Sequence, residues 1–355
     1  MDKEVLRDIW HGQLPLCFKL HPDDVSGMHR PEPYYMMVPR VTYFPIVLDR
    51  VVKYFNRFMD QSKNSTDEMW LDFDGQHIKA HHPIGLSWDL FGTSYELPWR
   101  LILHFSDFPS KDLVKCNSKA SIKSIFMSSI KEADALKHKG SVTKNMLEKD
   151  QNLLWSSLVN DKFDQFWSIN KRLMDRIDNE LFRCIPFRLY FPDYTYIQKI
   201  IKPCTIEKQL FFNPNLLNHN QQLQQQDHDG GLQIPPIYAK DTVINNKAHK
   251  CSHSASDIEE ARLDSRAHRY STMLDLIQCS FSKRLDDLLV DNFNKPQQTD
   301  ELIDVKFFRY RFLSHGIEIP FDTPLQWLSE HLSYPDNFLH ICAVKKEDKI
   351  GTFTY

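Results

Sequence analysis

The order of apolar patterns near the N-terminus recurs near the C-terminus, and this internal repeat limits how the chain can fold. In the first copy, two stretches alternate like strands and a longer one has apolar residues at helical spacing. A third strand then ends in Asp74-Gly75, a dipeptide typical of hairpin turns. A short helix and a closing strand follow, which places the elements at 14–20, 34–38, 44–58, 70–73, from residue 83, and at 99–105.

The second copy repeats the most distinctive parts of this order. Its first strand, 185–191, carries a proline at the same place as the strand that contains Pro15. Both closing strands follow a proline, Pro98 in the first copy and Pro335 in the second. The remaining elements are predicted as helices at 270–281 and 284–290, a strand at 305–313, a short helix at 323–332 and the closing strand at 338–341.

One sheet wrapped over one helix satisfies this order, which is that of a ubiquitin-like β-grasp roll. The sequence therefore predicts an α+β fold, in which two ubiquitin-like β-grasp domains flank a helix-rich domain. A polar stretch with scattered prolines is expected to be a disordered insertion in the second roll. The predicted domains are 1–110 with a short N-terminal helix, 111–180, and 181–345 with the insertion at about 215–265, followed by a tail at 346–355.

Lys131 lies in the most informative helix of the middle domain, which Ser118 is expected to cap and Gly140 to end. At about 100° per residue, Lys131 is opposite the middle of the apolar stripe. That stripe consists of Ile122, Ile125, Phe126, Ser129, Ala133 and Leu136. The expected neighbours of Lys131 on the outer face are Ser124, Met127, Asp134, Ala135 and His138. An ordinary solvated lysine would have the same position, so geometry alone assigns it no function.

Composition excludes several classes of function. Basic and acidic residues number 44 and 47 and are interspersed, whereas a nucleic-acid-binding face would be basic. The sequence has no phosphate-binding glycine loop, no metalloprotease or hydrolase motif, and no apolar run long enough to span a membrane. The seven cysteines are widely spaced and no signal peptide precedes them, which indicates reduced thiols in a cytosolic protein. His249, Cys251 and His253 lack a second ligand pair, so neither a metal nor a cofactor is expected.

Four sequence blocks resemble the autophagy-related protein 5 family. They are PEPYY at 31–35, MSSIKEADALKHK at 127–139, FDQFW at 163–167 and TPLQWLSEHLSYPDNFLH at 323–340. They occur in the family order, and the match fails only at 215–265 and in the tail from Lys345. The resemblance implies the same fold of two ubiquitin-like domains around a helix-rich domain.

The resemblance also implies a function. Lys131 would be the acceptor of an isopeptide bond from the ubiquitin-like autophagy-related protein 12, whose surface would rest on Met127, Asp134 and Ala135. The conjugate would bind autophagy-related protein 16 as a helix in a groove. It would then promote, like a ubiquitin ligase, transfer of autophagy-related protein 8 homologues to phosphatidylethanolamine. Further expected partners are the conjugation enzymes autophagy-related proteins 7, 10 and 3. The chain would be cytoplasmic and recruited peripherally to the phagophore assembly site membrane through its partners.

Two alternatives to this scaffold function remain from the residues themselves. The first is a binding adaptor with ubiquitin folds that is never conjugated. The second is a cysteine-dependent enzyme, which requires an exposed cysteine of low pKa beside a basic group. No cysteine stands in a suitable motif, so no catalytic residue is predicted.

Overall fold

The computed structural model describes residues 1–26, 30–59, 68–92, 95–176, 180–191, 195–206, 268–280 and 310–346. The insertion predicted at 215–265, the helix predicted at 284–290 and the tail from residue 347 lie outside the described residues. The chain divides into two compact units. The smaller unit comprises Asp178–Glu180 and Cys204–Arg269, and its described part contains strand β8 (Cys204–Ile206), which pairs with β9 (His268–Tyr270).

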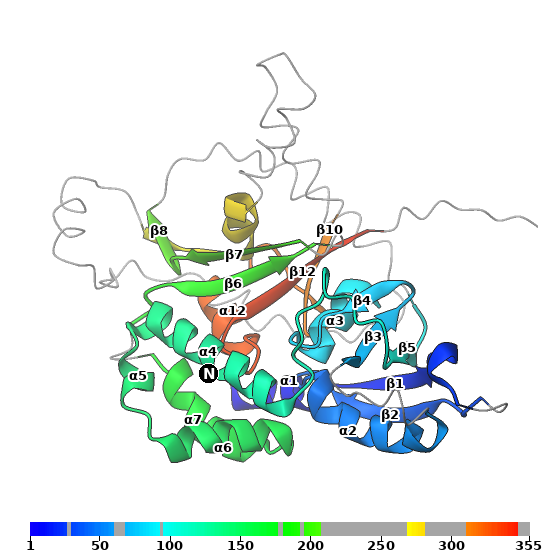
Figure 1. Ribbon diagram of the computed structural model, residues 1–355. Coiled ribbons are helices and arrows are strands. Elements are labelled where there is room, and N and C mark those ends of the chain that lie inside the picture. The colour runs from blue at the N-terminus through cyan, green and yellow to red at the C-terminus, as the bar shows by residue number, and fades with distance from the viewer. Residues whose placement is uncertain are drawn as a thin grey trace, which may run out of the picture. The chain divides into compact units, whose positions relative to one another are not determined.

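The first sheet of the larger unit has five strands in the order β2-β1-β5-β3-β4 (Figure 1). Strand β1 is antiparallel to β2 and parallel to β5, which places the first and last strands of the domain side by side. Its elements are β1 (Gln13–Leu20), β2 (Tyr34–Pro39), α2 (Phe44–Phe55), β3 (Trp70–Phe73), β4 (Gln76–Ile78), α3 (Ile84–Phe91) and β5 (Trp99–His104). The order confirms the predicted β-grasp roll.

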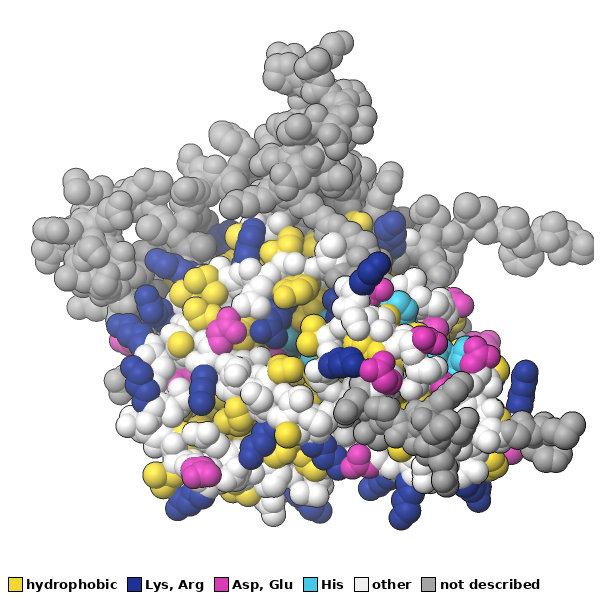
Figure 2. All heavy atoms as spheres, in the orientation of Figure 1, with side chains coloured by type: hydrophobic (Ala, Val, Ile, Leu, Met, Phe, Trp, Pro, Cys, Tyr) yellow, Lys and Arg dark blue, Asp and Glu magenta, His cyan; other side chains and the backbone are white. Residues whose placement is uncertain are grey.

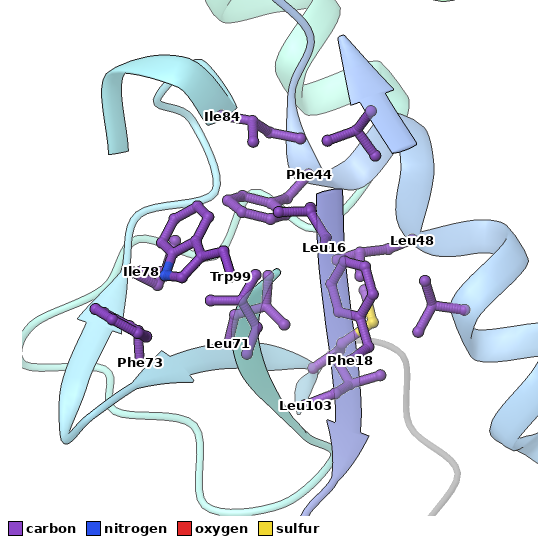
Figure 3. Close-up of a cluster of buried hydrophobic side chains, with 14 of the residues drawn as sticks. Leu16, Phe18, Phe44, Leu48, Leu71, Phe73, Ile78, Ile84, Trp99 and Leu103 are labelled. Carbon is purple, nitrogen blue, oxygen red and sulfur yellow. The ribbon is translucent and has the colours of Figure 1, made fainter. Parts of the chain in front are cut away.

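The core of this roll lies between the sheet and α2. Alternate residues of β1, including Leu16 and Phe18, are fully buried and face Phe44 and Leu48 of α2 (Figure 3). Trp99 is also fully buried, with its ring centroid 6.1 Å from that of Phe44. Burial of side chains of this size contributes about 1.5–3 kcal/mol each, so the period of two in β1 fixes which face of the sheet α2 covers.

The second sheet repeats the first. Its strand order is β11-β10-β12-β6-β7, which is the order of the first sheet when read from β7. Its elements are β6 (Ile185–Tyr190), β7 (Tyr196–Ile201), a helix at 273–280, β10 (Tyr310–Ser314), β11 (Ile317–Glu318), α12 (Leu325–His331) and β12 (Leu339–Lys345). The bridge Tyr43↔Pro83 of the first roll has its counterpart in Thr272↔Pro324. The internal repeat is thereby confirmed.

A bundle of helices joins the two rolls. Its members are α1 (Lys3–His11), α4 (Lys119–His138), α5 (Ser141–Lys144), α6 (Glu148–Val159) and α7 (Phe163–Met174). Trp10 of α1 packs against Phe163 and Phe166 of α7, with ring centroids 6.0 and 4.9 Å apart. The N-terminal helix, which the sequence places in the first ubiquitin-like domain, therefore also belongs to the core of the bundle.

Helix α3 is buried from residue 84 to residue 90, because both rolls cover it. Its Leu86 and Leu90 belong to an apolar cluster with Tyr190, Leu313 and Tyr334 of the second roll. The Sγ atom of Cys342, on β12, lies 3.7 Å from the carbonyl oxygen of Leu86. A helix of eight residues thus packs on its own sheet and on its neighbour.

A buried ion pair lies beside this helix. The Arg40 guanidinium binds the Asp89 carboxylate, and their side chains are 10% and 1% exposed. The second carboxylate oxygen of Asp89 accepts a hydrogen bond of 2.7 Å from the backbone N–H of Gly316, in the turn between β10 and β11. Asp89 therefore connects a charge of the first roll to the backbone of the second.

We predict that Asp89→Ala lowers the free energy of unfolding by about 3–5 kcal/mol, because it leaves the Arg40 charge buried without a partner. Urea denaturation of the full chain measures the change. The matched control is Asp164→Ala, which removes a carboxylate that is 70% exposed and pairs with Lys3 and Arg7. That surface change is expected to alter stability by less than about 1 kcal/mol. Equal effects of the two substitutions would contradict the prediction.

Candidate functional site

Helix α4, which carries Lys131, begins and ends almost where the sequence places its boundaries. The Ser118 hydroxyl accepts a hydrogen bond of 3.1 Å from the Ser121 N–H, as expected of an N-cap. At the other end, Lys139 adopts the left-handed conformation with φ of 58°, and Gly140 follows with φ of 75°. The predicted stop is therefore correct to within one residue, although a lysine takes the left-handed position that glycine usually occupies.

Lys131 is exposed, as predicted, and shares its face with Ser124, Ser128 and Ala135, which are exposed as well. The predicted surroundings were partly wrong. Met127 and Asp134, expected on the outer face, are 9% and 2% exposed, and His138 is also buried. Conversely Ile125, assigned to the apolar stripe, is 38% exposed. Of the residues proposed to support an attached protein, only Ala135 is exposed.

The physical reason is that α4 packs on more than one side. It contacts β6 (Figure 1) as well as α2 and α5, so a single stripe of apolar residues does not describe its buried surface. Asp134 is buried because its carboxylate caps α5, accepting hydrogen bonds of 2.8 and 2.7 Å from the N–H and hydroxyl of Thr143. These two hydrogen bonds, both to one oxygen, offset part of the cost of burying the carboxylate, whose other oxygen has no hydrogen-bond partner among the described residues.

The Lys131 amine has no hydrogen-bond or ion-pair partner among the described residues, which distinguishes it from two neighbouring lysines. The amine of Lys123 donates to the Asn152 side chain at 2.8 Å. The amine of Lys119 pairs with Asp49 at 2.5 Å. Lys139 is exposed as well, but it lies at the left-handed end of the helix. Figure 2 shows basic side chains scattered over this face of the molecule rather than gathered in one patch.

Lys137, in the last turn of α4, is buried at 2% exposure, which is unusual for a lysine. Its amine lies 3.3 Å from the Met174 sulfur and 5.0 Å from the centroid of the Phe182 ring. Burial lowers the pKa of Lys137 to about 7, against the opposing influence of Asp336 and Glu330. Lys137 is therefore no competitor of Lys131 for a reaction with another protein.

Glu132, the residue after Lys131, connects the helix to the second sheet. Its carboxylate accepts a hydrogen bond of 2.8 Å from the Gln198 amide on β7 and lies 3.9 Å from the Arg188 guanidinium on β6. Arg188 also lies 3.5 Å from Asp336 and stacks over the Phe338 ring at 4.0 Å. The position of the Lys131 turn is thereby coupled to the second roll.

The sequence prediction missed this connection. Arg188 is a charged residue within an otherwise apolar strand, which was the signal available. Its partner Asp336 is 4% exposed. Burial alone would raise the pKa of the Asp336 carboxyl, but His340, Arg188 and the Phe338 N–H together lower it. A charged carboxylate is therefore held inside the second roll by these groups.

A cleft lies where the two rolls and the helix bundle meet. It is shallow and partly open to solvent, with a cavity volume of about 20 Å³. Ile9 and Trp10 of α1, Trp167 of α7 and His331 of α12 contribute to its walls, together with Val41 and Tyr334. The indole N–H of Trp167 is buried there without a hydrogen-bond partner among the described residues. The lining is mostly apolar, and His315 Nδ1 and the Tyr334 hydroxyl are likewise buried there without a hydrogen-bond partner among the described residues.

Two buried cysteines, Cys116 and Cys342, lack the features of a reactive thiol. Cys116 lies 4.0 Å from the His81 ring nitrogen, but burial raises its pKa to about 11. Burial also raises the pKa of the Cys342 thiol well above its ordinary value. Both thiols stay protonated near neutral pH and are poor nucleophiles. Cys251 lies outside the described residues.

We predict that Lys137→Met stabilises the chain at pH 7 and that the gain shrinks toward about pH 10. Between the folded pKa of about 7 and the ordinary value of 10.5, the unfolded chain binds a proton at Lys137 that the folded chain does not. The stability of the native chain therefore rises with pH across this window, and the substitution removes that slope. Thermal unfolding of both chains at pH 7 and about pH 10 measures the difference in stability. Lys131→Met is the control, and parallel curves for Lys137→Met and the native chain would refute the prediction.

No helix among the described residues has both the length and the hydropathy needed to cross a membrane.

Three family models cover most of the chain. They are described as the UblA domain of autophagy protein ATG5, its alpha-helical bundle region and its UblB domain, and they match residues 9–105, 119–176 and 184–343. They assign the two rolls to ubiquitin-like domains and the bundle to the region between them, which confirms the predicted fold class.

Curated relatives and a solved structure agree with this assignment. Autophagy protein 5 of Drosophila melanogaster is 35% identical over 349 residues, with 98% of each chain covered. Autophagy-related protein 5 of Caenorhabditis elegans is 29% identical and covers 96% of this chain and 98% of its own. The crystal structure of Kluyveromyces marxianus Atg5 has a TM-score of 0.62 at 13% identity, over 97% of this chain and 100% of that one, and it supports the fold alone. The chain therefore belongs to the autophagy protein 5 family.

Proposed function

We propose that Lys131 is the acceptor of an isopeptide bond from autophagy-related protein 12. Membership of the family supports a role in autophagy, and its ubiquitin-like domains point to a conjugation scaffold rather than a catalytic enzyme. The observation that carries the residue assignment is that the Lys131 amine is exposed and has no partner in the described part of the chain, on a helix that is otherwise packed on several sides. An amine that must reach the active site of another protein needs this accessibility.

The proposed reaction requires little from the acceptor chain. The neutral amine of Lys131 attacks the thioester carbonyl that links the C-terminal glycine of autophagy-related protein 12 to a cysteine of a conjugating enzyme. The amide bond forms, the enzyme thiolate leaves, and the proton from the amine passes to solvent or to an enzyme base. The docked enzyme supplies proximity and orientation, which for well-placed reactants contribute about 7–11 kcal/mol. The family resemblance implies autophagy-related proteins 7 and 10 as the enzymes of this stage.

The coupling of α4 to the second sheet supports this role. Glu132 is held by Gln198 and lies near Arg188, so the turn that carries Lys131 has a fixed place relative to β6 and β7. A fixed acceptor loses less conformational entropy when an enzyme docks around it. The attached protein would rest near Ala135 and Ile125, which are exposed, rather than on Met127 and Asp134, which are buried.

We further propose that the cleft beside α1 binds a helix of autophagy-related protein 16. The walls of the cleft come from both rolls and from the helix bundle, and they are mostly apolar. An amphipathic helix would insert its apolar face there, and the Trp167 N–H would find an acceptor. The conjugate would then act like a ubiquitin ligase, bringing autophagy-related protein 3 to the phagophore membrane for lipidation of autophagy-related protein 8 homologues. Recruitment would proceed through these partners.

We predict that Lys131→Arg abolishes the conjugate in cells that lack the endogenous protein. With the native chain, an immunoblot should show a second band, heavier by one ubiquitin-like protein. The substitution keeps the charge but replaces the nucleophilic amine by a guanidinium, which stays protonated. Lys123→Arg and Lys139→Arg are the matched controls on the same helix and should leave the heavier band unchanged.

Each other outcome has a definite meaning. A heavier band that persists in Lys131→Arg and disappears in Lys139→Arg would place the acceptor at the end of the helix. If the native chain itself gives no heavier band while its partners still co-precipitate with it, the chain is a non-covalent adaptor.

We predict that Ile9→Asp weakens binding of a synthetic helix of autophagy-related protein 16 by more than about tenfold, because it places a charge on the wall of an apolar cleft. Isothermal titration with the full chain measures the affinity. Asp8→Ala is the control, since Asp8 is exposed on the same helix. If Ile9→Asp unfolds at the same temperature as the native chain and binds the helix with unchanged affinity, this cleft is excluded as the binding site.

A further inference from the structure

Three potential metal ligands meet at one end of the first sheet, remote in sequence from Lys131. His21 follows β1, Asp24 ends the short 3₁₀ helix η1 (Pro22–Asp24), and His104 is the last residue of β5. Since β1 and β5 are parallel neighbours, their C-terminal ends lie at the same edge of the sheet. One nitrogen of each imidazole and one carboxylate oxygen of Asp24 all lie within 4.8 Å of one another.

The carboxylate of this cluster is held in place from the side of β5. Asp24 is 2% exposed. One of its oxygens accepts a hydrogen bond of 3.0 Å from the Phe105 N–H, and the other accepts one of 3.1 Å from the Ser106 hydroxyl. Metal-binding carboxylates are commonly oriented by such neighbours, and each oxygen keeps a further lone pair for a cation.

The imidazole of His104 is fixed as well. It stacks on the Trp70 indole with ring centroids 3.8 Å apart and an angle of 9° between the planes. Trp70 is itself held by a hydrogen bond of 2.9 Å from its N–H to the Ser106 carbonyl oxygen. His104 is 9% exposed, and its buried Nε2 has no hydrogen-bond partner among the described residues. A buried polar atom without a partner costs about 1–3 kcal/mol, so this position has a reason to take a ligand.

We propose that His21, Asp24 and His104 form a binding site for a divalent transition-metal ion, with Zn²⁺ as the best fit. Two imidazoles and one carboxylate are a donor set that suits zinc, whereas Ca²⁺ and Mg²⁺ require mostly oxygen ligands. Three protein ligands leave a fourth tetrahedral position, which water would fill. The site belongs to the first ubiquitin-like domain and does not depend on the conjugation proposed for Lys131.

A modest movement closes the cluster around an ion. Ligand atoms of a tetrahedral zinc site are about 3.4 Å apart, given bonds of about 2.0–2.1 Å. His21 is partly exposed, and its ring lies 4.4 Å from that of His104 at an angle of 27°. The His21 Nδ1 accepts a long hydrogen bond of 3.4 Å from the Asp23 N–H, and rotation of this side chain would bring a ring nitrogen closer while Asp24 and His104 stay in place. The bound ion would join η1 to the end of β5 and so stabilise the edge of the first sheet.

The test is zinc binding by the full chain, purified with a chelator and then dialysed. All proteins carry His249→Gln, Cys251→Ser and His253→Gln, which removes the other histidine and cysteine cluster of the sequence. Isothermal titration with Zn²⁺ should give one site, and zinc should raise the temperature of thermal unfolding. Co²⁺ in place of zinc should show the visible absorption of tetrahedral coordination and quench the fluorescence of Trp70, which stacks on His104.

Two substitutions should remove this binding, and one should not. We expect His21→Gln and Asp24→Asn to weaken zinc affinity by at least about tenfold. The control is His77→Gln, because the His77 ring also contacts Trp70, with centroids 5.1 Å apart, but is outside the cluster. His21→Gln alters a partly exposed side chain, so it serves if Asp24→Asn lowers stability by itself. Equal zinc affinity in His21→Gln and His77→Gln, or no binding by the parent chain at millimolar zinc, would overturn the proposal.

Discussion

The burial of α3 between two sheets is the constraint on which the arrangement of this chain depends. An ordinary β-grasp roll needs a second short helix only to close its own core, yet α3 is buried along nearly its whole length. Asp89, in the same helix, neutralises Arg40 and binds the backbone of the other roll. Gly85 allows the backbone of Arg40 to lie close to α3, because a Cβ atom at Gly85 would lie 2.9 Å from the Arg40 carbonyl oxygen. Apolar packing and one buried charge pair thus hold the two rolls in a single unit.

Helix α4, which carries Lys131, depends on the same principle of shared packing. Helix α4 contacts its neighbours in the bundle and also β6, and Glu132 adds a polar connection to β7. Its exposed strip is consequently narrow, and Lys131 lies within it. Other lysines of the helix are buried, paired or at its end, so access to an amine is determined by packing rather than by any chemical activation. If Lys131 is the acceptor as proposed, packing alone would select it among the lysines of the helix.

Sequence reasoning predicted the fold well because its signals are local. Alternation in β1, the Ser118 cap and the Asp74-Gly75 turn are each decided by a few neighbouring residues. The surroundings of Lys131 depend on which elements pack together, and there a single apolar stripe was insufficient. Several elements, β6, α5 and α7, cover the side of α4 that a simple amphipathic helix would expose to solvent. This burial includes Met127, Asp134 and Lys137. Lys137 was the least predictable, since a lysine buried beside the Met174 sulfur and the Phe182 ring contradicts the usual preference of that residue for the surface.

The two hairpin turns of the repeat have the same backbone conformation but different surroundings. Asp74-Gly75 and His315-Gly316 have nearly the same backbone, with φ of 50° and 77° in one and 52° and 80° in the other. A Cβ atom on Gly75 would meet nothing within 4 Å, whereas one on Gly316 would lie 3.1 Å from the Arg40 guanidinium. Gly75 in the first turn has open space beside it, whereas Gly316 in the second turn packs against Arg40 and donates a hydrogen bond to Asp89 of the other roll. The copies are therefore no longer interchangeable, and exchanging one for the other would preserve each sheet while losing their attachment.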